Sequence, residues 1–292
     1  MATVEIDGIP HYYEWILGEK RDRKPVMVFV HGWGGSSRYW ESTARALSDT
    51  YDCLIYDMRG FGRSSFKSQQ RDADNPHPDP RHPSYSMETY VEQLKSLLDA
   101  LQLDRVSLHA HSMGASIAAL FASRYGDRLH QLVLTCSGIF AYNKLTFTLF
   151  HRIGGLVVSF RPAWLPAIPG SDRLFMARFV HKPLPQHDSQ AFLNDYLQAD
   201  GSANLGTMYT CVSKHASIVM PQAFSALSVP TLLVAGEKDI IIPPRLGQQA
   251  AQLNDAIQYV EIPKVAHFPM LERPEAYLET LQNFLQPLAI AR

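Results

Sequence analysis

The sequence predicts an α/β protein: a doubly wound, mostly parallel sheet of about eight strands with an inserted helical cap. Two observations support this. Short continuous apolar runs, typical of strands buried on both faces, alternate with segments whose apolar residues recur at helical spacing. The alternation stops between residues 138 and 221 and then resumes. We therefore expect residues 1–137 and 222–292 to form the core and residues 138–221 to form the helical cap insertion.

The composition is that of an ordinary globular protein. Of the 292 residues, 46% are hydrophobic and 19% are charged, and the formal net charge is −1. This balance gives no electrostatic basis for binding nucleic acid. The three cysteines, Cys53, Cys136 and Cys211, lie in apolar or helical stretches. We expect them to be buried thiols in a reducing compartment rather than parts of a disulfide framework.

No segment has the pattern of a signal peptide or a membrane span. The first residues lack a basic region followed by an apolar one. The longest apolar candidate, residues 145–158, is interrupted by His151, Arg152 and a glycine pair, and a spanning helix needs roughly 18 apolar residues. We therefore expect a soluble, cytoplasmic protein without a transmembrane segment.

The N-terminal part supplies the first strands. Residues 3–17 alternate around Asp7-Gly8, a turn signal that predicts an antiparallel hairpin. A helix is expected from about Ser37 to Leu47. Two continuous apolar runs flank it and predict buried strands: Val26–Val30 and Cys53–Tyr56.

A long polar loop follows. Residues 64–84 contain four prolines, which predicts a surface loop. Its His77, Asp79 and His82 are better explained as solvated loop residues than as metal ligands. Ser86 then caps a helix whose apolar residues recur at helical spacing: Met87, Val91, Leu94, Leu98 and Leu101.

The rest of the chain is organised around the stretch from Val106 to Tyr125. A strand-like run, Val106 to His109, precedes Ala110-His111-Ser112-Met113-Gly114, and a helix of small residues follows. This is the spacing of a nucleophile elbow, a strained strand-to-helix turn that exposes the serine hydroxyl. Small residues are needed two positions before and after the serine because two backbones pass close together there. Ala110 occupies the first of these positions, where a glycine is usual.

Further strands are predicted at Leu132–Cys136, Thr231–Ala235 and Tyr259–Ile262, and Pro274 begins the last helix. The region between residues 138 and 221 is helical in pattern and broken by prolines. Most of its aromatic side chains are expected to be packing residues. Five are candidates to line a substrate pocket: Phe147, Phe150, Trp164, Phe175 and Phe179.

Polar residues follow three of the predicted strands. Ser112 follows one, the segment ending at Asp239 follows another, and His267 comes after the last. Parallel α/β sheets gather their active sites at the carboxyl ends of the strands, so we expect these side chains to meet. Serine, then acid, then histidine is the chain order of the α/β-hydrolase triad.

The chain resembles the α/β-hydrolase fold superfamily along nearly its whole length, within the serine-nucleophile, esterase- and lipase-like branch. The resemblance implies that Ser112 is the nucleophile, His267 the base and Asp239 the acid that orients it. It also implies an oxyanion hole formed by the backbone N–H groups of Trp33 and Met113. Neither a metal nor a cofactor is expected. The motifs that carry the resemblance are His31-Gly32-Trp33-Gly34, Asp57 to Ser64, the elbow at Ser112, Gly236 to Asp239, and His267.

Several residues near these motifs have alternative explanations. Glu237 competes with Asp239 for the role of the acid, although it could instead cap a turn. His109 stands in the elbow strand where an apolar residue is expected, and we interpret it as a hydrogen-bonded core histidine rather than a site residue.

Other polar residues of the motifs are expected to organise loops. His31 and His111 are expected to hold loop backbones near the site. Asp57 and Arg59 are expected to form a loop-organising pair, with a direct substrate role as the alternative.

A serine at the elbow favours acyl transfer to water through an acyl-enzyme. Epoxide hydrolases and haloalkane dehalogenases of this fold use aspartate there, which argues against both. The apolar cap suggests a small-molecule ester with a hydrophobic acyl or alcohol part. The prediction is therefore a carboxylesterase- or lipase-like serine hydrolase.

Three other functions stay open. A hydrolase of carbon–carbon bonds in a dienoate-type diketone would need a cap arginine facing the pocket. A ligand-binding receptor that retains the fold is a second possibility. A peripheral membrane enzyme with residues 145–165 in a lipid interface is a third. The candidate cap arginines are Arg152, Arg161, Arg173 and Arg178.

Overall fold

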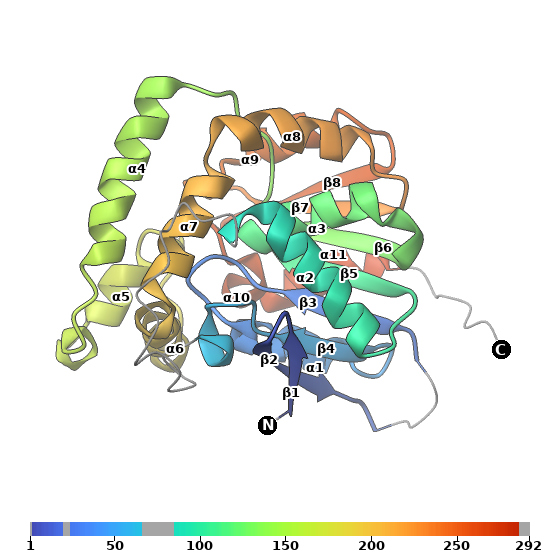
Figure 1. Ribbon diagram of the computed structural model, residues 1–292, viewed down its shortest axis with the longest axis horizontal. Helices are drawn as coiled ribbons and strands as arrows, with labels where there is room; N and C mark the ends of the chain where they lie inside the picture. Colours follow the sequence, from blue (N-terminus) through green and yellow to red (C-terminus); the bar gives the residue numbers. More distant parts are fainter. Residues whose placement is uncertain (1, 20–23, 66–84, 286–292) are drawn as a thin grey trace.

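The computed structural model describes residues 2–19, 24–65 and 85–285 of the chain (Figure 1). Its strands are β1 (Ala2–Ile6), β2 (Ile9–Ile16), β3 (Val26–Val30), β4 (Asp52–Tyr56), β5 (Val106–His111), β6 (Leu129–Thr135), β7 (Thr231–Gly236) and β8 (Ile257–Ile262). They form one sheet in the order β1-β2-β4-β3-β5-β6-β7-β8. Each lies within three residues of its predicted position.

All neighbouring strands from β4 to β8 in this order are parallel. β2 and β4 pair in the antiparallel sense, and so do β1 and β2. The hairpin between β1 and β2 turns at Asp7 and Gly8, which both have positive φ, 53° and 75°. This is the backbone that an Asp-Gly turn favours between two twisted strands. The predicted doubly wound, mostly parallel sheet is confirmed.

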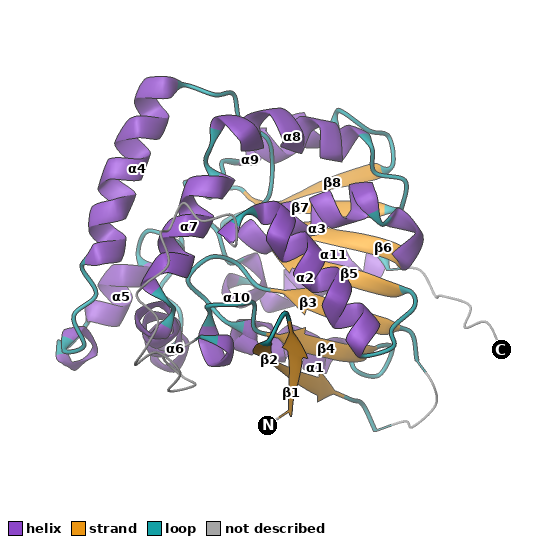
Figure 2. Ribbon diagram, viewed as in Figure 1, coloured by secondary structure: helices purple, strands orange, loops and turns teal. Residues whose placement is uncertain are grey.

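Helices cover both faces of the sheet (Figure 2). They are α1 (Glu41–Leu47), α2 (Met87–Ala100), α3 (Met113–Arg124), α4 (Lys144–Ser159), α5 (Ser171–Met176), α6 (Gln186–Gln198), α7 (Gly201–Cys211), α8 (Lys214–Ser225), α9 (Pro244–Ala251), α10 (Pro269–Glu272) and α11 (Pro274–Phe284). The predicted helix from Ser37 begins as a 3-10 turn, Ser37–Trp40, before α1. Ser86 caps α2 as expected, accepting the backbone N–H of Thr89 at 3.1 Å.

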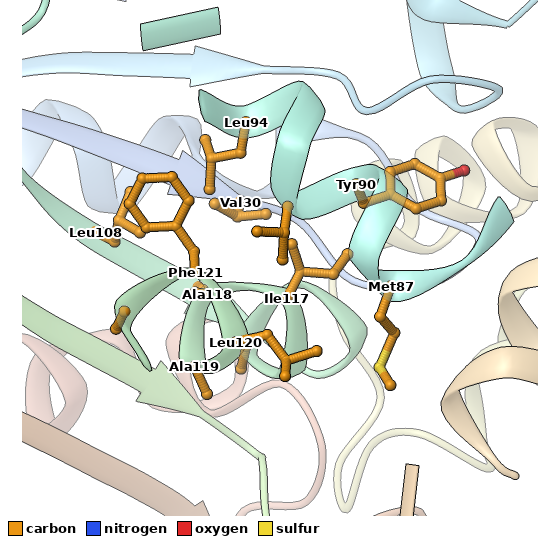
Figure 3. Close-up of a cluster of buried hydrophobic side chains, with 14 of the residues drawn as sticks. Val30, Met87, Tyr90, Leu94, Leu108, Ile117, Ala118, Ala119, Leu120 and Phe121 are labelled. Atoms are coloured by element: carbon orange, nitrogen blue, oxygen red, sulfur yellow. The ribbon is translucent and has the colours of Figure 1, made fainter. Parts of the chain in front are cut away.

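Two apolar clusters lie on the two sides of the sheet. Figure 3 shows part of the first, where Leu94 of α2 and Phe121 of α3 lie against Val30 and Leu108 of the sheet. The second joins the other face of the sheet to Trp40, Ala44 and Leu47 near α1 and to Tyr277, Leu281 and Phe284 of α11. Burial on both faces explains why the central strands have continuous apolar runs.

Along the sequence, helices α4 to α8 come between β6 and β7, and no strand interrupts them. They contact the loops at the carboxyl ends of the strands: Asp200 N–H donates to Gly60 O, and the Trp33 indole N–H donates to Asn204 O. Helix α8 instead packs against α3 and α9 beside the sheet. The division of the chain at residues 138 and 221 stays a prediction.

Nearly all of the predicted loop at residues 64–84 lies outside the described residues. All three cysteines are free, with Cys53 and Cys136 buried and Cys211 partly exposed.

Candidate active site

Ser112 occupies a strained turn between β5 and α3. Its φ of 53° and ψ of −120° lie in a region that residues with a side chain rarely adopt. Surrounding hydrogen bonds hold this backbone in place. Ser112 N–H donates to Thr135 O at 2.9 Å, and Ser112 O accepts from the N–H groups of Ala115 and Ser116. The nucleophile elbow predicted from the sequence therefore has the expected backbone.

Close approach of two loops explains the small residues around the elbow. A Cβ on Gly114 would lie 2.3 Å from His31 O and 2.8 Å from Val30 O. A Cβ on Gly32 would lie 3.2 Å from Ser112 Cβ. Ala110, by contrast, fits its methyl group into the fully buried strand β5. The tight requirement at this elbow thus applies to Gly114, two residues after the serine.

Ser112, His267 and Asp239 form one hydrogen-bonded line. His267 Nε2 lies 2.9 Å from Ser112 Oγ, and His267 Nδ1 lies 2.7 Å from Asp239 Oδ2. Asp239 accepts two further bonds at Oδ1, from the N–H groups of Ile241 and Ile242. A carboxylate is an acceptor only, so His267 carries its proton on Nδ1 and Nε2 is free to accept from the serine hydroxyl. Histidine and aspartate are both buried.

Glu237, the rival candidate for the acid, lies in a different environment. Its Oε2 accepts from Lys264 N–H at 2.8 Å, and its Oε1 lies 2.7 Å from Lys238 Nζ. The carboxylate behind His267 is therefore that of Asp239.

The predicted oxyanion donors lie at the two loops that meet at Ser112. Trp33 follows Gly32, the residue packed on Ser112, and Met113 is the first residue of α3. Neither backbone N–H has a hydrogen-bond partner within the described parts of the chain. A helix N-terminus favours negative charge, so the Met113 amide is suited to an anionic oxygen.

A residue absent from the sequence-based predictions, Tyr39, connects these loops. Its hydroxyl accepts from Gly32 N–H and lies 3.0 Å from His111 Nδ1. His111 Nε2–H in turn donates to His267 O at 2.7 Å. Burial keeps the pKa of His111 well below its ordinary value, so the ring is neutral and Nδ1 accepts from Tyr39. His111 thus holds a loop backbone, as expected for this residue.

His31 also binds loop backbone, as expected. Its Nε2 accepts Met58 N–H at 2.9 Å and its Nδ1–H donates to Gly32 O at 2.8 Å. Burial lowers its pKa, which favours the neutral ring that this arrangement requires.

The prediction that Asp57 pairs with Arg59 is wrong, because the partner is Arg63. Arg63 Nε lies 2.8 Å from Asp57 Oδ2, and Ser37 donates to Oδ1 through both its N–H and its hydroxyl. Burial alone would raise the pKa of Asp57, but the bonds and charge of Arg63 hold it below its ordinary value. Arg59 instead stacks over the Tyr85 ring, 5.5 Å from its centre.

His109 lies in the core rather than at the site. Its Nε2 is 2.6 Å from the Tyr277 hydroxyl, which also bonds Thr135, and its ring stacks on Phe29. Burial lowers its pKa to about 3, so the ring is neutral. Nδ1 has no partner within the described residues, so the expected core histidine is hydrogen-bonded through one nitrogen.

The described residues contain one group with the composition of a metal site, His111, Cys136 and His267, whose ligand atoms lie within 4.8 Å of one another. Both nitrogens of His267 already bond Asp239 and Ser112, and His111 Nε2 bonds a carbonyl. A metal at this position would therefore displace the serine from the histidine.

Two of the five pocket candidates lie near the site. Phe179 O accepts His267 N–H at 2.9 Å, and the two rings are 6.3 Å apart. Phe175 contacts Phe179 and, at 4.8 Å, Tyr196, whose ring lies 5.6 Å from that of Trp33. Aromatic side chains from α5, the turn after it and α6 therefore lie between the loop of Trp33 and the loop of His267.

The ring contacts of the other three candidates lie within residues 138–221. Phe147 is buried against Tyr142, with ring centres 4.9 Å apart. Phe150 and Trp164 are exposed, and Trp164 lies edge-on to Phe160. A role in lining a pocket stays a prediction for all five residues.

The described residues include no helix with the length and apolar character required to cross a membrane.

Comparison with known proteins gives related hydrolases. The chain is 21% identical to a pimeloyl-[acyl-carrier protein] methyl ester esterase of Aeromonas hydrophila, over 91% of this chain and 98% of that protein. It is 24% identical to epoxide hydrolase 3 of Xenopus tropicalis, over 96% of this chain and 75% of that protein.

The crystal structure of an enol-lactonase from Burkholderia xenovorans is similar in fold. Its TM-score is 0.75 at 19% identity, and the match covers 97% of this chain and 99% of that one. The sequence profile of the alpha/beta hydrolase fold matches residues 25–274. With its eight-stranded sheet, strained serine turn and serine–histidine–aspartate line, this chain belongs to the alpha/beta hydrolase fold family.

Proposed function

We propose that this protein is a serine hydrolase that cleaves a small carboxylic ester with a hydrophobic acyl or alcohol part. The observation that carries the proposal is the line of 2.9 Å and 2.7 Å contacts from Ser112 through His267 to Asp239. A serine hydroxyl is a weak nucleophile until an adjacent base takes its proton, and an imidazole held by a carboxylate is such a base.

The first half of the reaction forms an acyl-enzyme. His267 Nε2 removes the proton of Ser112 as Oγ attacks the ester carbonyl carbon, and the carbonyl oxygen becomes an oxyanion. The N–H groups of Trp33 and Met113 receive that oxyanion, and losing one such donor typically costs about 100- to 1000-fold in turnover. Asp239 keeps the imidazole in the required tautomer and stabilises the imidazolium. The imidazolium then protonates the departing alcohol.

The second half repeats these steps with water. His267 takes a proton from water, whose oxygen attacks the acyl carbon, and returns it to Ser112 Oγ as the acid leaves. No group beyond the three side chains and the two backbone donors is required.

The choice of substrate class rests on two features. The aromatic side chains over the site, including Phe175, Phe179 and Tyr196, favour an apolar group. The relative from Aeromonas is an esterase, which supports ester cleavage. The epoxide hydrolase relative is a weaker guide to the reaction, because enzymes of that class carry aspartate at the elbow.

The carbon–carbon hydrolase is less well supported. Arg152, Arg173 and Arg178 are exposed. Arg161 is directed to backbone carbonyls, with Nη1 2.5 Å from Ala199 O and 3.3 Å from Tyr196 O. The one partly buried arginine of the four is therefore bonded to backbone carbonyls, which does not favour a role in binding the carboxylate of a dienoate. A cytoplasmic location is part of the proposal as well and rests on the free thiols.

A fluorophosphonate probe tests the proposal directly, because it reacts with an activated serine. Wild-type protein should be labelled at Ser112 and should hydrolyse p-nitrophenyl esters, whereas Ser112→Ala should do neither. His267→Ala should lose most of both activities with an unchanged circular dichroism spectrum. Equal labelling of wild type and Ser112→Ala would contradict the assignment. Tight binding of a small molecule without turnover would favour a receptor.

A further inference from the structure

Helix α4 lies at the outer edge of the molecule, beyond α7 (Figure 1). One side of it is fixed to the protein. Phe147 and Val158 are buried, His151 Nε2 donates to Val212 O at 2.6 Å, and Gly154 lies against Met208 of α7. Within the described parts of the chain, no side chain covers the opposite side in this way.

That opposite side is apolar and exposed. Its residues follow one another at intervals of three and four positions, so at 100° per residue they form a stripe about 80° wide along some 24 Å of helix. We call them, with the neighbouring Trp164, the α4 face. Its five residues from Leu145 to Phe160 are each between 52% and 79% exposed, and Trp164 is 56% exposed. The α4 face consists of Leu145, Leu149, Ile153, Leu156, Phe160 and Trp164.

Single exposed apolar residues are normal, but a continuous stripe of four large ones on one helix is not. Phe160, directly after the helix and bonded through its N–H to Leu156 O, extends the stripe. Helices with apolar residues on both sides are ordinarily buried on both sides. Trp164, whose ring lies 6.3 Å from that of Phe160, continues the stripe beyond the end of the helix. The α4 face therefore marks a contact surface.

The exposed charges of the segment that carries the α4 face have one sign. Residues 144–182 contain six lysines and arginines and a single acid, Asp172, although the whole chain has a net charge of −1. Asp172 is buried, so the exposed charges of this segment are all positive. The exposed cations are Lys144, Arg152, Arg173, Arg178 and Lys182.

We infer that the α4 face docks onto an anionic lipid bilayer. The apolar side chains enter the boundary between headgroups and acyl chains, and Trp164 suits that depth because it joins an apolar ring to a polar N–H. Lys144 and Arg152, the exposed cations of α4 itself, lie at the level of the anionic headgroups, each contributing attraction within a Debye length. The helix lies on the bilayer and does not cross it.

A second copy of this chain fits the surface less well. In a symmetric dimer the same patch faces itself, so the surrounding cations of one copy would approach those of the other. An anionic bilayer offers both an apolar layer and charges of the opposite sign. The docking surface is independent of the proposed reaction, because binding to vesicles requires no catalysis.

The test uses the full-length protein and sedimentation with vesicles of phosphatidylcholine, with or without 30 mol% phosphatidylserine. Wild type should bind the vesicles that contain phosphatidylserine, and 0.5 M NaCl should weaken the binding. The double variant Leu149→Glu, Leu156→Glu should bind these vesicles at least about 20-fold more weakly than wild type, because two negative charges enter an anionic interface. Lipids brominated near the headgroup should quench the emission of Trp164, with Trp164→Phe as the reference.

Leu17→Glu is the matched control, because Leu17 is also an exposed leucine, with 61% of its surface accessible. It follows the end of β2 that pairs with the start of β4, away from the candidate site. This variant should bind vesicles like wild type. All variants should keep their melting temperatures and their fluorophosphonate labelling in solution, which separates failure of docking from failure of the reaction. Equal vesicle binding by wild type and the double variant, or none by wild type, would overturn the inference. So would a lipid-free wild-type dimer that the same two substitutions dissociate.

Discussion

His111 donates its Nε2–H to the backbone carbonyl of His267 at 2.7 Å, joining the residue before the elbow serine to the loop that carries the base. Through Tyr39, the same ring is connected to Gly32 in the loop of the candidate oxyanion donor. One buried side chain thus sets the relative position of three loops that come from distant parts of the sequence.

Replacing His111 with phenylalanine should misplace the base without removing it. We expect kcat to fall by about 100-fold, the typical cost of a shift of about 1 Å in a catalytic group, with KM changed much less. His111→Gln, which can still donate to the carbonyl, should recover part of the loss. Steady-state kinetics with a p-nitrophenyl ester and thermal melts measure both effects. A lower melting temperature with unchanged kcat in both variants would mean that His111 only stabilises the fold.

Asp239→Asn should lower turnover by roughly 10⁴. If the amide oxygen keeps the N–H groups of Ile241 and Ile242, the NH2 group faces His267 Nδ1 and donates to it, which favours the wrong tautomer. Glu237→Gln is the matched control, two residues earlier and bonded to Lys264 and Lys238 instead of His267. It should retain activity within a few fold. If Glu237→Gln lost more activity than Asp239→Asn, the acid would have been assigned to the wrong residue.

The length of the acyl chain should matter if the aromatic residues over the site form an apolar pocket. Each methylene that becomes buried contributes up to about 0.8 kcal/mol, or roughly fourfold in kcat/KM. A series of p-nitrophenyl esters from acetate to decanoate should show kcat/KM rising until the pocket is full. A flat series together with efficient turnover of a dienoate would support the carbon–carbon hydrolase instead.

Gly114→Ala should destabilise the fold strongly, because its Cβ would lie 2.3 Å from the backbone oxygen of His31. A loss of about 3 kcal/mol or more in the free energy of unfolding is expected. The same substitution at Gly155 in α4 has only the Tyr209 hydroxyl within reach, at 3.5 Å, and should stabilise the helix by about 0.5–1 kcal/mol. Urea unfolding of both variants makes the comparison, and equal effects would contradict the close approach at the elbow.

Asp195 of α6 makes stability depend on pH. Burial raises its pKa to about 6 from an ordinary value of 3.8, and its Oδ2 accepts from the Ser36 hydroxyl. Between these pH values the folded carboxyl holds a proton that the unfolded chain has released, so its contribution to stability falls as pH rises and levels off above pH 6.

Asp195→Asn removes this titration and keeps an acceptor for Ser36. The variant should therefore exceed wild type in stability by about 1–3 kcal/mol at pH 8, with a smaller difference at pH 5. Urea unfolding at the two pH values measures this. Parallel pH curves for the two proteins would show that the carboxyl does not titrate in this range.

The strands, the hairpin at Asp7 and Gly8, and the elbow at Ser112 could be predicted because each depends on a local pattern of residues. The partner of Asp57 could not. Arg59 and Arg63 lie in the same loop, and only the folded structure shows that the Tyr85 ring takes one and the carboxylate the other. Tyr39 carries no sequence signal, since its role depends on a contact with His111, 72 residues away.

Helix α4 illustrates a different limit. Apolar residues occur on two opposite sides of the helix, so the sequence predicted packing for aromatic residues such as Phe147 and Phe160 alike. Phe147 is buried, whereas Phe160, directly after the helix, is exposed. Which of the two apolar sides meets the protein depends on the position of α7, and that position is set by contacts far from α4 in the sequence.

The left-handed backbone at Ser112 has a consequence for how this position can change. Glycine adopts φ 53° and ψ −120° without the steric cost that a side chain brings, which is about 1–3 kcal/mol. Ser112→Gly should therefore be more stable than both wild type and Ser112→Ala, although it lacks a nucleophile. Folding stability alone therefore gives no reason for a serine at this position.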